Sequence, residues 1–103
     1  MASDVIKILM TWDIRPDREA DYFEFVMKEF APGLMRMGIQ PTEAWYTAYG
    51  AGPQILTGAV APDLESMSRM LNSGEWHELK ERLLSYVDNY DQKIVPASGR
   101  FQL

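Results

Sequence analysis

The chain has 103 residues, a length that predicts a single domain over residues 1–103. Of these residues 47% are apolar and 24% charged, which is ordinary for a soluble globular protein. Cysteine is absent, which excludes disulfides, thiolate metal sites and a cysteine nucleophile. The net charge of −5 and the scattered Lys and Arg residues argue against nucleic acid as a partner.

The first predicted strand runs from Val5 to Ile14, because this stretch is rich in β-branched and large apolar residues. No signal-peptide pattern precedes it and no apolar run is long enough to span a bilayer, so we expect a cytoplasmic protein with no membrane partner. Arg15-Pro16-Asp17 ends the strand, and Asp17 is predicted to cap a helix. The apolar stripe of this helix consists of Phe23, Val26, Met27, Phe30 and Leu34. Pro32 should kink the helix or restart it in a new first turn.

A hairpin is predicted next. Its strands span Ile39 to Tyr49 and Gln54 to Val60, and Gly50-Ala51-Gly52-Pro53 between them is typical of a turn. In the first of these strands Trp45, Thr47 and Tyr49 should share one side, opposite to Tyr46.

A second helical layer is predicted from Asp63 to Tyr90, with a single break near Ser73-Gly74. Its apolar positions recur at helical spacing: Leu64, Met67, Met70 and Leu71, then Trp76, Leu79, Leu83, Val87 and Tyr90. Asp63 and Ser73 are the expected N-caps of the two parts. A fourth strand should cover Gln92 to Val95 and stop at Pro96.

This order of elements predicts an α+β, ferredoxin-like βαββαβ fold, with a four-stranded antiparallel sheet and two helices on one face. Large apolar residues occur on both sides of the first strand, although the sequence does not decide which side faces the helices. Because two helices cover only one face, we expect a homodimer through the other face of the sheet. The alternative is a monomer whose second face is semi-polar and solvated.

The order of elements resembles that of the dimeric α+β barrel superfamily, which includes antibiotic-biosynthesis-monooxygenase-like, NIPSNAP-like and stress-responsive barrel domains. Three local features resemble it too: the strand-Arg15-Pro16-Asp17-helix opening, the helix end from Pro32 to Gly38 before a Trp45-bearing strand, and Asn72-Ser73-Gly74-Glu75-Trp76 in the second helical layer. The resemblance spans roughly residues 5–95. It implies a dimer whose paired sheets enclose a partly apolar pocket.

Aromatic residues on neighbouring strands are the main candidate site. Trp12, Trp45, Tyr46 and Tyr49 could line a pocket for a flat apolar ligand, with Thr11 or Thr47 as hydrogen-bonding groups. The alternative is that these side chains only pack in a dimer core or across the strands.

His77, the only histidine, is the one side chain whose ordinary pKa suits acid–base catalysis near neutral pH. Its helical position points away from the sheet, which suggests a surface residue. In haem-degrading relatives the axial histidine would match a position nearer Lys80, and the first strand here lacks their asparagine, so we expect no haem and no other cofactor. No residue cluster suggests a metal site.

Two functions therefore remain open. One is a barrel that binds a small apolar or aromatic ligand between paired sheets, without strong catalytic machinery. The other, implied by the resemblance, is a cofactor-independent monooxygenase or isomerase that acts on an aromatic or polyketide-like molecule.

Overall fold

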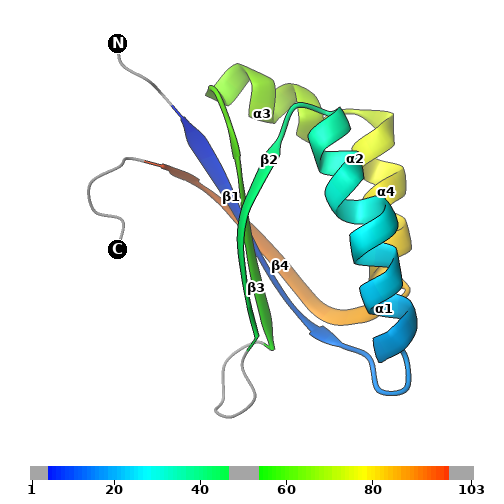
Figure 1. The fold of residues 1–103 in the computed structure, drawn as a ribbon. Coiled ribbons are helices and arrows are strands. Elements are labelled where there is room, and N and C mark those ends of the chain that lie inside the picture. The colour runs from blue at the N-terminus through cyan, green and yellow to red at the C-terminus, as the bar shows by residue number, and fades with distance from the viewer. Residues whose placement is uncertain (1–4, 47–53, 98–103) are drawn as a thin grey trace.

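The computed structural model describes residues 5–46 and 54–97, which form one antiparallel sheet with the strand order β2-β3-β1-β4. The strands are β1 (Ile6–Ile14), β2 (Gln40–Tyr46), β3 (Ile55–Ala61) and β4 (Val87–Pro96). The helical segments lie on one side of the sheet (Figure 1): α1 (Glu19–Phe25), the π-helical turn η1 (Val26–Phe30), α2 (Ala31–Arg36), α3 (Leu64–Leu71) and α4 (Gly74–Leu84). The ferredoxin-like prediction is confirmed. None of these helices is long and apolar enough to cross a membrane.

The two faces of β1 have different neighbours. Ile8, Met10 and Trp12 are buried beneath the helices, with at most 1% of each exposed. Because side chains alternate along a strand, Leu9 and Thr11 point to the opposite, helix-free face. The more apolar row therefore faces the helices, which answers the question that the sequence left open.

The first helical layer contains a π turn immediately before Pro32, which then occupies the first turn of α2. The predicted restart at Pro32 is confirmed. The predicted apolar stripe was partly wrong, since Phe23 is 49% and Met27 74% exposed, whereas Phe25 is buried. A π turn closes over five residues and so shifts the helical phase. As a result Phe25 and Phe30, five residues apart, both reach the core.

The start of this layer also differs from the prediction, because Asp17 does not cap the helix. Arg18 is the N-cap residue, and no side chain accepts a hydrogen bond there. Asp17 instead has a φ of 69°, a left-handed conformation that aspartate tolerates in turns. Asp17, which we expected to cap the helix, therefore belongs to the tight turn that it forms with Pro16.

The second helical layer breaks where predicted, and both caps are present. Asp63 Oδ1 accepts the Ser66 N–H at 2.8 Å, and Ser73 Oγ accepts the Trp76 N–H at 3.1 Å. These caps satisfy backbone donors that a helix start otherwise leaves unpaired. The buried side chains of α3 and α4 are Met67, Met70, Trp76, Leu79 and Leu83.

The end of this layer was predicted wrongly. α4 stops at Leu84, and β4 begins at Val87 rather than at Gln92. Val87 and Tyr90 are three residues apart and both lie on the core side, which imitates a helical stripe. They do so because a bulge interrupts the pairing of β1 with β4, and Asn89 within it has a φ of 60°. The extra residue returns Tyr90 to the face that Val87 occupies.

Candidate ligand cavity

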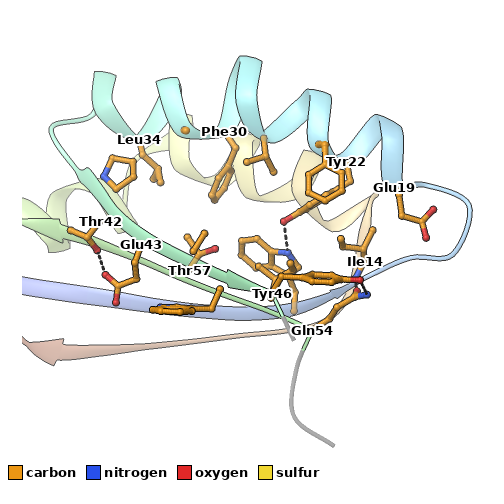
Figure 2. A pocket seen from close by; sticks show the side chains of 18 residues that line it. Ile14, Glu19, Tyr22, Phe30, Leu34, Thr42, Glu43, Tyr46, Gln54 and Thr57 are labelled. Carbon is orange, nitrogen blue, oxygen red and sulfur yellow. Dashed lines mark hydrogen bonds between the residues drawn. The ribbon is translucent and has the colours of Figure 1, made fainter. Parts of the chain in front are cut away.

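A cavity of about 670 Å³ lies between the first helical layer and the part of the sheet formed by β1, β2 and β3. Its walls are mainly aromatic and aliphatic, and Tyr22, Phe30 and Leu34 point from the helices towards the sheet (Figure 2). Across from them the sheet offers small side chains, because Ala44 of β2 is paired with Thr57 of β3. The volume is within the range of roughly 300–1,000 Å³ that is typical of small-molecule sites.

Trp12 is held rigidly at the floor of the cavity. Its indole Nε1–H donates to the Tyr22 hydroxyl at 2.9 Å, and its ring meets Phe30 edge-on with 6.0 Å between centroids. The other side of the indole stacks on Tyr90 at 5.9 Å. Burial raises the pKa of the Tyr22 phenol, which is therefore a neutral hydroxyl at physiological pH.

A hydrogen-bonded cluster joins three strands at one end of the cavity. Gln54 Oε1 accepts the backbone N–H of Ile14 at 2.7 Å, while the backbone N–H of Gln54 donates to Asp13 Oδ1 at 2.8 Å. Asn89 Nδ2 donates to Asp13 Oδ2 at 2.9 Å. The bonds from Asn89 and then from Gln54 lower the pKa of Asp13, because they stabilise its carboxylate. This cluster fixes the start of β3 against β1.

An ion pair crosses the helix-free face of the sheet, where Lys7 Nζ lies 2.9 Å from Glu43 Oε2 and 3.0 Å from Oε1. The pair passes over Gly58, where an added Cβ would lie 3.1 Å from both side chains. Hydrogen bonds from Thr42 and then from Lys7 lower the pKa of Glu43. Glu43 also borders the cavity, but Lys7 already holds its carboxylate.

The predicted pocket residues lie in different places. Trp12 and Trp45 are both among the residues that line the cavity. Trp45 pairs with Leu56, however, so its side chain points to the helix-free face, opposite to the side chains of Ala44 and Tyr46. Thr11 points to the helix-free face, away from the cavity, and residues 47 and 49 (Thr47 and Tyr49) lie outside the described residues. A pocket between two paired sheets stays a prediction, because one chain contains only one of the two sheets.

His77 is exposed on α4 and is not among the residues that line the cavity. Its Nδ1 lies 2.9 Å from the backbone oxygen of Ser73, one helical turn earlier. The sequence analysis missed Tyr22 and Gln54, which contribute polar atoms to the cavity. A tyrosine within an apolar helical stripe was the available signal for Tyr22, since a buried hydroxyl needs a partner. Nothing local distinguishes Gln54.

Solved structures share this ferredoxin-like arrangement of one antiparallel sheet with helices on one face. A NIPSNAP family protein from Agrobacterium tumefaciens matches with a TM-score of 0.70 and 16% identity, over 98% of this chain and 92% of its own. An EthD family protein from Bacillus halodurans has a TM-score of 0.70 and 11% identity, over 91% of this chain and 99% of its own. SnoaB, a cofactor-independent oxygenase from Streptomyces nogalater, has a TM-score of 0.69 and 15% identity, over 97% of both chains.

These likenesses show the fold and do not extend to activity. No protein-family model matches the sequence, and neither does any curated protein.

Proposed function

We propose that this protein binds a small, flat and mainly apolar molecule in the cavity between its first helical layer and the sheet. The observation that supports it is the cavity of about 670 Å³, whose walls are mainly aromatic and aliphatic, with a smaller number of polar side chains among them. Burial of aromatic ligand surface there supplies the binding energy, at roughly 25 cal/mol per Å². No Lys, Arg or His is among its described lining residues, so opposite charge does not attract an anionic ligand.

Filling the cavity tests this proposal. Ala44 lines the cavity from β2, so we expect Ala44→Trp to occupy the ligand volume and to weaken binding of the neutral dye Nile red by at least about tenfold. Ala20→Trp is the matched control, because Ala20 is exposed on α1 and does not line the cavity. Fluorescence titration measures the affinity, and circular dichroism verifies the fold of both variants. Failure of the unmodified protein to bind the dye, or equal binding by Ala44→Trp, would refute the proposal.

We infer further that the protein acts as a cytoplasmic homodimer, with residues 1–103 as its domain and a second copy on the helix-free face of the sheet. The support is that Leu9, Leu56 and Val60 lie there in partial exposure, with the ion pair of Lys7 and Glu43 between them. Two copies of this face would bury the apolar residues of both sheets.

Sedimentation tests the dimer. The unmodified protein should sediment with twice the mass of the 11.8 kDa chain, and Leu9→Lys should shift it to the monomer while the fold persists. Leu64→Lys is the control, because Leu64 is exposed on α3, on the helical side. A monomer at micromolar concentration of the unmodified protein would contradict this inference and leave the cavity proposal intact.

A cofactor-independent oxygenase or an isomerase is the second candidate. It is favoured by the shared fold with SnoaB and by a cavity of suitable size for a polycyclic aromatic substrate. Against it, proton abstraction needs a group that is deprotonated near neutral pH. Tyr22 does not meet this need, because its raised pKa keeps the phenol protonated there. We therefore expect no oxygen uptake above the uncatalysed rate with a reduced polycyclic ketone such as anthrone. Saturable uptake that Ala44→Trp abolishes would establish the oxygenase instead.

A further inference from the structure

Gln54 presents a hydrogen-bond donor of fixed orientation at the polar end of the cavity. The backbone N–H of Ile14 can only meet the carbonyl oxygen of the Gln54 amide, so the amide cannot be flipped. The Nε2 amino group therefore lies at the other end of the side chain. Its one partner within residues 5–46 and 54–97 is the Tyr46 hydroxyl, at a long 3.5 Å. Among the described residues, therefore, at least one N–H donor of Gln54 has no partner and can meet a ligand.

Tyr22 provides a second donor. Its hydroxyl oxygen accepts the Trp12 N–H at 2.9 Å, and among the described residues its own proton is donated to no acceptor. The side chain is only 3% exposed and lines the cavity. Trp12 and Tyr46 both pair with Ile55, the residue after Gln54, so these polar groups gather at one end of the cavity (Figure 2).

The charges around the cavity disfavour a ligand whose hydrogen-bond acceptor is an anion. The ionisable acids that line it are Glu19 and Glu43, and Lys7 holds Glu43 from the helix-free face. No cationic side chain is found in the described lining. An anionic ligand would lose its hydration and gain no opposite charge, which is costly in an apolar site. A neutral oxygen meets no such penalty.

We propose that the cavity selects neutral aromatic ligands that carry a carbonyl oxygen, with Tyr22 and Gln54 as the residues that recognise this oxygen. This inference rests on the proposed binding function and adds the chemical class of the ligand. Both donors lie at the same end of the cavity, so the apolar rings of the ligand extend from there along Phe30 and Leu34. Asp13 is a positioning residue, because it holds the backbone of Gln54 in place.

Three naphthalenes of nearly equal shape test the proposal by calorimetry: 2-acetonaphthone, 2-isopropenylnaphthalene and 2-naphthoate. The ketone should bind the unmodified protein about tenfold more tightly than the alkene, as expected for two neutral hydrogen bonds in an apolar site. The carboxylate should bind more weakly than the ketone. Equal affinity of ketone and alkene, or tighter binding of the carboxylate, overturns the carbonyl proposal while the cavity function stands. Failure of all three to bind overturns both.

Two variants assign the effect to the named residues. Gln54→Glu keeps an oxygen for the Ile14 N–H but removes the amino donor, so the preference for the ketone over the alkene should fall several-fold. Gln40→Glu is the matched control, since Gln40 is exposed on β2 and does not line the cavity. Tyr22→Phe removes the hydroxyl donor and should also reduce the preference for the ketone. It tests the proposal independently if Gln54→Glu does not fold. A full ketone preference in a folded Gln54→Glu or Tyr22→Phe variant refutes the corresponding assignment.

Discussion

Replacing Tyr22 by phenylalanine tests how tightly the floor of the cavity is built. The hydroxyl of Tyr22 accepts the indole N–H of Trp12 at 2.9 Å, and the two side chains are 3% and 1% exposed. Tyr22→Phe keeps the ring and leaves the buried N–H without an acceptor, which costs about 1–3 kcal/mol. For a chain of this size that loss corresponds to a fall in melting temperature of roughly 4–20 °C.

Urea unfolding followed by circular dichroism measures the change, with Tyr86→Phe as the matched control. Tyr86 is half-buried against Phe25, and its hydroxyl has no hydrogen-bond partner among the described residues. The control should change the free energy of unfolding by less than about 0.5 kcal/mol. If Tyr22→Phe costs no more than the control, the hydrogen bond from Trp12 does not hold the floor of the cavity in place, and our account of a rigid floor is refuted.

Three further predictions concern other parts of the chain. Ser73→Ala removes the acceptor for the Trp76 N–H at the start of α4 and should cost about 1 kcal/mol in urea unfolding, whereas Ser68→Ala, on the exposed side of α3, should cost less than about 0.5 kcal/mol; equal losses would contradict the cap. Gly38→Ala should cost about 1 kcal/mol, because Gly38 has a φ of 83°, and an unchanged melting temperature would show that the backbone relaxes. Burial raises the pKa of Tyr90 above 10.0, so its contribution to stability is complete below about pH 10 and is lost as the pH rises through the folded pKa. Tyr90→Phe should therefore flatten the alkaline fall in unfolding free energy, and an unaltered slope would contradict this.

The fold was predictable because local patterns carry most of it. The apolar run of β1, the caps at Asp63 and Ser73 and the proline restart at Pro32 each depend on neighbours within a few residues. The errors occurred where a backbone irregularity changed the side-chain period. The bulge at Asn89 made part of β4 resemble a helix, and η1 shifted the buried stripe of the first helical layer.

The candidate site was less predictable, because it depends on space between layers. The sequence by itself determined that Trp12 belongs to the more apolar row of β1, and that His77 lies on the exposed side of its helix. Only the tertiary structure decided that Trp12 forms the floor of a cavity on the helical side, since this depends on which small side chains of β2 and β3 face the helices. Likewise, Gln54 becomes a recognition group only because folding brings it to Ile14 and Asp13, 40 and 41 residues earlier in the chain. Hydrophobic periodicity is read within one segment, whereas a cavity and its donors are made by several segments together.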